Sequence, residues 1–255
     1  MGHDAGLGGR LGVEPRGDHL ALRPASGLVR DGRLRAGVLL WLADWEACRE
    51  AVAGDGTVIV ATRELRLRVL QPMAVDETTV IVARATPLRR SSRNSVIEVR
   101  IHREGDGTPL AYAVGSYVAR RWDGAPDTNP QITMTDEAVL AQRPPIEEPL
   151  DGLLGAVPVP GRPGVVRIPA DPELQNPQGG LSGPVVGLAA EAAVEAAAGR
   201  GSPLHDLAVA FLATGLTGPF VAHAEPLGAG TYRAEVRDEG AGVLLAAAVG
   251  LAGPL

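Results

Sequence analysis

The chain contains one short pattern twice. Residues 35–44 read RAGVLLWLAD and residues 182–191 read SGPVVGLAAE: glycine near the start, a run of small or apolar residues and an acid at the tenth place recur at an offset of 147 (191 − 44). Each run is apolar nearly all round, and a helix of that kind must be buried on most sides. A repeat this long indicates duplicated domains, because solenoid repeats span only about 20–50 residues. The sequence therefore predicts two similar units, each built around a buried helix.

Segments with the composition of β-strands follow each predicted helix. They alternate polar and apolar residues or are rich in β-branched residues, and turn-forming residues separate them. The segments are 62–70, 78–85 and 95–102 in the first copy, and 206–213, 219–225, 231–238 and 243–252 in the second. The triplet AVG at 113–115 recurs at 248–250, near the end of each copy. We expect an α+β fold in which an antiparallel sheet wraps around each central helix.

A proline-rich segment separates the two copies. Residues 122–150 show little apolar periodicity and contain Pro126, Pro130, Pro144, Pro145 and Pro149. This composition is typical of a linker that lies across the surface. We therefore expect an N-terminal domain over 1–121, a linker over 122–150 and a C-terminal domain over 151–255.

Composition argues against several classes of function. The net charge of −6 disfavours general nucleic-acid binding, which needs a strongly basic face. No apolar run approaches the ~20 residues of a membrane span, and the N-terminus lacks the apolar segment of a secretory signal. The only cysteine, Cys48, rules out an internal disulfide and fits a reducing compartment. We expect a cytoplasmic protein with neither a membrane nor a nucleic-acid partner.

Asp44 is an acid in an apolar setting, with Trp41 and Trp45 close by in the sequence. Burying a carboxylate is costly unless something pairs with it or uses it. Desolvation also raises its basicity and nucleophilicity, so Asp44 is a candidate catalytic group. The alternative is a structural cap or ion pair. Cys48, one turn further on, is interpreted as a small buried hydrophobic residue rather than a nucleophile.

The repeat resembles tandem hotdog-fold acyl-CoA thioesterases of the phenylacetate-pathway and 4-hydroxybenzoyl-CoA type. That family opens its central helix with Asn-x-x-Gly-x-x-His-Gly-Gly and has an acid seven residues later. The second copy follows this spacing with Asn176, Gly179, Ser182, Gly183, Pro184 and Glu191; the first copy has Val29, Gly32, Arg35, Ala36, Gly37 and Asp44. Ser182 and Arg35 therefore replace the family's histidine. Thr62 matches the Ser or Thr that opens the family's next strand.

The resemblance implies two hotdog domains whose sheets join into one continuous, pseudo-dimeric sheet. It also implies sites that straddle the two units. One such site combines Asp44 and Thr62 of the first copy with Asn176, Ser182 and Gly183 of the second. In that site Asp44 is the base or nucleophile, the Gly183 N–H stabilises the oxyanion, and Asn176 and Thr62 position the attacking water. Asn176 as a simple cap is the alternative.

The second composite site is degenerate. It retains the acid, Glu191, but has Leu204 in place of the hydroxyl residue and Val29 and Ala36 in place of the asparagine and glycine. We interpret Glu191 as a relic or a structural group. The resemblance thus predicts one working site rather than two.

Arg89, Arg90 and Arg93 form a basic cluster in a predicted hairpin turn. Their functional interpretation is binding of coenzyme A phosphates, because the guanidinium fork suits phosphate oxygens. The alternative is a solvated charge cluster without a ligand.

Two functions remain open. The first is an acyl-CoA thioesterase; the second is a non-catalytic acyl-CoA or lipid-binding protein, which the missing histidine favours. The remaining histidines lie on or beside predicted strands, so no hydratase-like centre is expected, and no spaced Cys/His cluster predicts zinc. We expect no cofactor and no metal. The expected partner is an acyl-CoA or related thioester, and a homodimer of such chains is compatible with the sequence.

Overall fold

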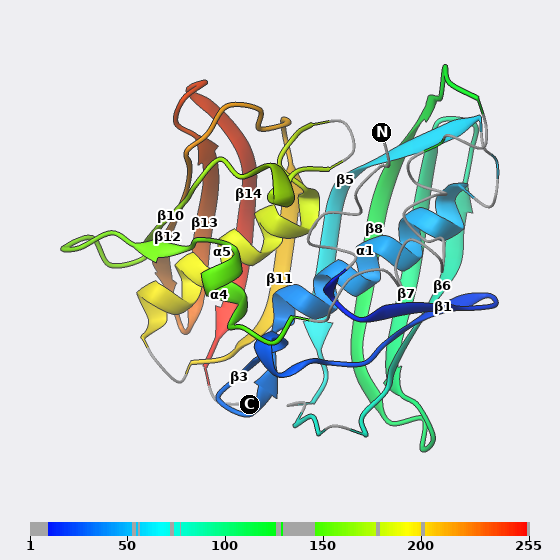
Figure 1. Ribbon diagram of the computed structural model, residues 1–255, viewed down its shortest axis with the longest axis horizontal. Helices are drawn as coiled ribbons and strands as arrows, with labels where there is room; N and C mark the ends of the chain where they lie inside the picture. Colours follow the sequence, from blue (N-terminus) through cyan, green and yellow to red (C-terminus); the bar gives the residue numbers. More distant parts are fainter. Residues whose placement is uncertain are drawn as a thin grey trace.

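The computed structural model describes residues 10–52, 55, 57–71, 74–76, 78–125, 129, 146–176, 179–199 and 202–253. Within the predicted linker, residues 126–128 and 130–145 lie outside this set. Strands from both halves of the described chain form one large antiparallel sheet, and two long helices lie across it (Figure 1). The fold is therefore of the α+β class, as predicted.

The first half contributes β1 (Val13–Arg16), β2 (His19–Leu22), β5 (Val58–Val69), β6 (Ile81–Arg90), β7 (Asn94–Arg103) and β8 (Pro109–Arg121). The second half contributes β9 (Val157–Pro158), β10 (Val165–Ile168), β11 (Leu204–Phe211), β12 (Phe220–Gly228), β13 (Thr231–Asp238) and β14 (Val243–Ala252). A separate ribbon consists of β3 (Val29–Arg30) and β4 (Arg33–Leu34). The helices are α1 (Ala36–Val52), α4 (Leu150–Leu153) and α5 (Gly183–Ala198), with 3-10 turns η2 (Ser26–Leu28) and η4 (Pro172–Leu174).

Every predicted strand segment overlaps an observed strand. The segments 231–238 and 243–252 have the bounds of β13 and β14, whereas β5 begins at Val58, ahead of the predicted start at 62. The sequence did not predict the short strands β1, β3, β4 and β9. Strands of two to four residues are too short to display the alternation on which such a prediction depends.

The strand order of the sheet is β1-β2-β6-β7-β8-β5-β11-β14-β13-β12-β10-β9. The first six strands come from the first half of the chain and the last six from the second half. Corresponding strands of the two halves follow in mirrored order, so that β5 and β11 meet at the centre. These two strands pair antiparallel, with Leu65 opposite Val209, and the sheet therefore runs unbroken from one half into the other.

Each long helix packs against the strands of its own half. α1 contacts β5, β6, β7 and β8, and α5 contacts β10, β12, β13 and β14. All residues from Ala36 to Ala47 in α1 are buried, and so are all residues from Pro184 to Val194 in α5. The nearly uniform apolar composition of both helices follows from this burial, because each faces the sheet on one side and the other helix on another.

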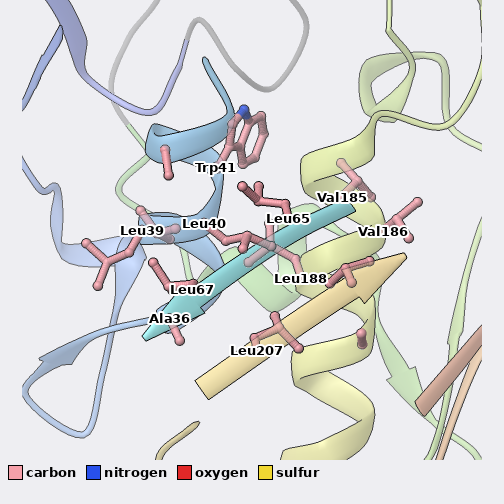
Figure 2. Close-up of a cluster of buried hydrophobic side chains, with 14 of the residues drawn as sticks. Ala36, Leu39, Leu40, Trp41, Leu65, Leu67, Val185, Val186, Leu188 and Leu207 are labelled. Carbon is pink, nitrogen blue, oxygen red and sulfur yellow. The ribbon is translucent and has the colours of Figure 1, made fainter. Parts of the chain in front are cut away.

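The two helices run antiparallel and touch at glycines. A Cβ atom at Gly37 would lie 2.5 Å from Cδ2 of Leu188, and one at Gly187 would lie 2.6 Å from Cδ2 of Leu40. Both distances are shorter than real Cβ contacts, so a larger residue at either position would require the facing leucine side chain to move. Figure 2 shows Leu40 and Leu188 in the resulting cluster, above β5 and β11 where the halves of the sheet join.

None of the helices in the described residues is long and apolar enough to cross a membrane.

Candidate active site

Asp44 lies in the middle of α1 with a side chain that is almost completely enclosed. The residue is 7% exposed, and two hydroxyl groups donate hydrogen bonds to its Oδ1 atom. Thr62 Oγ1, on β5, is 2.8 Å away, and the Tyr117 hydroxyl, on β8, is 3.4 Å away. The carboxylate is thus held from two neighbouring strands of its own half.

The strand register explains why these two hydroxyls meet the same oxygen. Thr62 stands directly opposite Tyr117 in the β5–β8 pairing, and an irregularity follows between Thr62 and Glu64. Val60 is buried before this irregularity and Leu65, Leu67 and Val69 are buried after it. Thr62 also turns toward the helix side, where it binds Asp44. A bulge often re-aims a side chain in this way beside a functional site.

Burial raises the pKa of Asp44 from 3.8 to about 6, against the opposing effect of the hydrogen bonds from Thr62 and Tyr117. Among the described residues, the groups that favour the charged form in this shift are the two hydroxyl donors. At neutral pH the carboxylate is deprotonated but more basic than an ordinary aspartate. It therefore has the properties of a general base.

The beginning of α5, from the other half of the chain, faces the second oxygen of Asp44. A Cβ atom at Gly183 would lie 4.0 Å from Asp44 Oδ2 and 3.5 Å from the ring of Phe211. Ser182 occupies the N-cap but makes no capping hydrogen bond with its side chain, and Pro184 has no N–H. Gly183 is thus the first residue of this helix with an N–H to offer at its positive end.

Asn176 belongs to a tight loop that leads into α5. Its backbone N–H donates to the Gly180 carbonyl at 2.7 Å, and its side-chain Oδ1 accepts from the Gly180 N–H at 3.1 Å. Gly179, inside the loop, has a φ of +79°, a conformation that favours glycine. This geometry shows Asn176 shaping the loop that leads into α5.

Cys48 lies one turn after Asp44, as the helical spacing requires. Burial, followed by the negative charge of Asp44, raises the pKa of its thiol well above the ordinary value. The thiol is therefore protonated at neutral pH and is not an activated nucleophile. Cys48 is partly buried and packs against the hydrophobic core.

The arginine cluster is split between a strand and a turn. Arg89 and Arg90 end β6, and Arg93 lies in the turn before β7, so the prediction that all three lie in the turn is wrong for two of them. All three are exposed; Arg90 pairs with Glu50 at 2.7 Å. The cause is the register: Arg90 stands opposite Ser95 near the end of the β6–β7 pairing.

The same register places the arginine cluster at the end of the strands that lies beside Asp44. Arg90, on β6, is opposite Ser95, which is opposite Tyr117, which is opposite Thr62. One row across four strands therefore leads from the cluster to the two hydroxyls that bind Asp44.

Glu191 sits in a different environment at the other end of the helix pair. It is 1% exposed, and Arg35 Nε donates to its Oε2 at 3.1 Å. Arg35 also donates to Asp151 at 2.6 Å, and Arg30 pairs with both Asp151 and Glu195. These five residues, Arg30, Arg35, Asp151, Glu191 and Glu195, are called the Arg35 network below. Glu191 is thus a partner in a buried ion pair.

Sequence reasoning missed several residues around both acids. Tyr117 and Phe211 lie in strands whose alternation says only that they face inward, with no sign of what they face. Within the described residues, no group of three or more His, Cys, Asp or Glu side chains is arranged to hold a metal ion.

No family model and no curated protein matches the sequence. Solved structures do match. The 12:0-ACP thioesterase from Umbellularia californica aligns with a TM-score of 0.63 at 7% identity, over 94% of this chain and 99% of that one. An acyl-ACP thioesterase from Bacteroides thetaiotaomicron aligns with a TM-score of 0.58 at 13% identity, over 91% and 96% of the two chains.

A third structure is described by its fold. It is a conserved protein of unknown function with a hot dog fold from Alicyclobacillus acidocaldarius, with a TM-score of 0.57 at 14% identity over 100% of this chain and 99% of that one. At such identities the likeness shows the fold alone. The chain has a hotdog fold, which it shares over nearly its whole length with structures of thioesterases.

Proposed function

We propose that this protein hydrolyses acyl thioesters at one composite site between its two halves, with Asp44 as the base or nucleophile and the Gly183 N–H as the oxyanion donor. One observation carries the proposal: the buried Asp44 carboxylate is held by Thr62 and Tyr117 through one oxygen while its other oxygen faces the start of α5. The thioesterase names of the structures with the same fold support the same reaction class.

The proposal includes the domain organisation. It treats residues 1–121 and 151–255 as two hotdog domains that form a pseudo-dimer inside one chain, with 122–150 as the linker. The mirrored strand order and the β5–β11 pairing support this assignment. It also explains the composite site, because the antiparallel helices bring the start of α5 beside Asp44 of α1.

In the simplest mechanism Asp44 accepts a proton from water while the water oxygen bonds to the thioester carbon. The negative charge that develops on the carbonyl oxygen lies at the positive end of α5, where the Gly183 N–H donates to it. The C–S bond then breaks, and the proton passes from Asp44 to the departing thiolate. The products are a free thiol and a carboxylic acid. Thr62 and Tyr117 fix the carboxylate during these steps.

We propose coenzyme A as the carrier of the acyl group. Arg89 and Arg93 are exposed at the end of the strands that lies beside Asp44. Neither of them takes part in a described ion pair. Guanidinium groups at that position suit the phosphates of coenzyme A. A carrier protein presents a similar phosphopantetheine thiol, so acyl-ACP substrates form the second arm of the test.

The test is release of free thiol from a panel of acyl-CoA and acyl-ACP thioesters of different chain length. Turnover of acyl-CoA supports the proposal, and turnover of acyl-ACP alone would change the carrier. Saturable binding without turnover would favour the second function, a non-catalytic acyl-CoA or lipid-binding protein, to which the serine at position 182 points.

The pH profile gives a more specific expectation. Because Asp44 must be deprotonated to act, kcat/KM is expected to rise about tenfold per pH unit below a midpoint near pH 6 and to level off above it. The measurement is kcat/KM between pH 3.5 and 8.5 at constant ionic strength. A midpoint near 4, the range of an ordinary aspartate, would show that the buried carboxylate is not the group that limits the rate.

The proposal places the protein in the cytoplasm, which a single cysteine fits. The proposal includes no metal and no cofactor. It also includes the assembly of two such chains into a homodimer.

A further inference from the structure

Gly115 and Tyr117 lie two residues apart on β8, on the side of the strand that faces α1. Both residues are buried, and Tyr117 is 1% exposed. A Cβ atom at Gly115 would lie 2.4 Å from the Tyr117 hydroxyl oxygen, 2.6 Å from Cε2 and 2.7 Å from Cζ. The outer part of the tyrosine ring therefore occupies the space that a side chain at position 115 would take.

The neighbouring strands leave this ring little freedom to move. Gly115 stands opposite Leu65 on β5 and opposite Ile97 on β7, and both of these side chains are at most 1% exposed. Because buried side chains are close-packed, an added methyl group at position 115 must displace the ring. The atom that it meets first is the hydroxyl oxygen that donates to Asp44 Oδ1 at 3.4 Å.

The second half of the chain repeats the glycine. The triplet AVG ends at Gly115 in β8 and at Gly250 in β14. Gly250 stands opposite Leu207 on β11, just as Gly115 stands opposite Leu65 on β5. The two glycines therefore occupy equivalent positions in the two halves of the sheet.

The side chain that fills the space over the glycine differs between the halves. Thr62 stands opposite Tyr117 before the irregularity in β5, and Leu204 stands opposite Ala252 before a similar irregularity in β11. A Cβ atom at Gly250 would lie 2.9 Å from Leu204 Cδ1. The space thus holds a leucine side chain in the second half, whereas in the first half it holds a phenol that reaches a carboxylate.

We propose that Gly115 is a positioning residue for Asp44: it leaves free the space in which the Tyr117 ring lies, so that the tyrosine hydroxyl reaches the carboxylate. Gly115 acts only through Tyr117. The catalytic consequence of this placement rests on the proposed hydrolysis, whereas the placement itself does not.

The groups around Asp44 determine what the loss of this hydrogen bond does. The hydroxyls from β5 and β8 lower the pKa of Asp44 against the burial that raises it to about 6. Among the described residues, the titratable groups beside Asp44 are Tyr117 and Cys48 of α1; burial raises the pKa of both well above the ordinary values, so both stay neutral at neutral pH. α5 and β11 present Gly183 and Phe211, which do not titrate. Displacing the Tyr117 hydroxyl is therefore expected to raise the pKa of Asp44 further.

The test is the pKa of the Asp44 carboxyl group, measured by carbon-13 NMR titration of the full chain and assigned by the loss of its signal in Asp44→Asn. Gly115→Ala and Tyr117→Phe are each expected to raise this pKa by about one unit. The two changes together are expected to raise it no further than either alone, because both remove the same hydrogen bond. Gly250→Ala is the matched control: it adds the same methyl group at the equivalent glycine and is expected to leave the pKa of Asp44 unchanged.

Thioester hydrolysis gives a second readout. A midpoint that moves up by about one unit lowers kcat/KM of Gly115→Ala about fivefold at pH 6 and changes it little at pH 8. A general loss of structure would lower kcat/KM at both pH values.

An unchanged pKa of Asp44 in folded Gly115→Ala, or a shift of the same size in Gly250→Ala, would overturn the proposal. If Gly115→Ala does not fold, its combination with Tyr117→Val removes the ring that the new methyl group meets and is expected to fold. A combination that stays unfolded would place the conflict elsewhere and would also overturn the proposal. The expected pKa shifts without thiol release by any variant, the wild type included, would refute the proposed hydrolysis and still support the placement of Tyr117 by Gly115.

Discussion

Asp44→Asn is expected to lose nearly all thioester hydrolysis. The amide can act neither as a base nor as a nucleophile, and loss of a general base typically costs on the order of 10²–10⁴-fold. The expected drop applies to kcat/KM measured by thiol release. Glu191→Gln is the matched control, since it makes the same change in the other half of the repeat. We expect it to retain close to wild-type activity, because Glu191 serves an ion pair with Arg35.

The variant Asp44→Asn should not be less stable than the wild type. The folded-state pKa of Asp44 is raised to about 6, so its charged form opposes folding above that pH, and the penalty disappears as the pH falls toward 4. Two pKa units correspond to up to about 3 kcal/mol, reduced by whatever Thr62 and Tyr117 lose in bonding to an amide. Thermal melts of Asp44→Asn and the wild type at pH 8 and pH 4 measure this difference in stability. They also show whether a loss of activity is due to an unfolded variant. Activity that survives in Asp44→Asn but disappears in Glu191→Gln would reverse the assignment of the working site.

Arg35→Ala is expected to lower the free energy of unfolding by about 3–5 kcal/mol. The substitution leaves Glu191, which is 1% exposed, as a buried charge without its partner. Asp151 and Glu195 retain Arg30, so the loss is concentrated on Glu191. Urea unfolding monitored by circular dichroism measures the change.

A double variant keeps this expectation testable even where Arg35→Ala does not fold. Replacing the pair together, Arg35→Met with Glu191→Leu, removes both charges and is expected to restore most of the lost stability. Arg100→Ala, which removes an exposed ion pair with Glu98, is the control and should cost less than about 1 kcal/mol. A cost for Arg35→Ala no larger than this control would show that the network contributes little to folding.

The sequence predicted the parts of this fold in which apolar residues recur at a regular spacing or in which the repeat is visible. Both long helices and the strand segments follow from the repeat and from the apolar runs around the two acids, whereas the expected inequality of Asp44 and Glu191 rested on the family resemblance. The bulge after Thr62 could not be predicted, because the residues before it, VIVA at 58–61, do not alternate and so give no phase to compare with the alternation from Leu65 to Val69. Tyr117 was missed for a related reason: its position on β8 predicts burial but not its neighbour.

Arg35 shows a different limit. The sequence presented it as the loss of a family histidine, whereas the structure makes it the centre of an ion-pair network. Two of its neighbours, Asp151 and Glu195, come from α4 and from a later turn of α5. Such contacts depend on how the two halves sit against each other, and no local pattern in either half encodes them.

The central claim is that one reaction centre is built from Asp44 of the first half and the start of α5 in the second. A crystal structure with a non-hydrolysable acyl-CoA analogue tests it most directly. The account predicts the carbonyl oxygen of the analogue at hydrogen-bonding distance, about 3 Å, from the Gly183 N–H, its carbonyl carbon beside Asp44 Oδ2, and its phosphates near Arg89 and Arg93. An analogue whose carbonyl lies beside Glu191, or away from both acids, would contradict it.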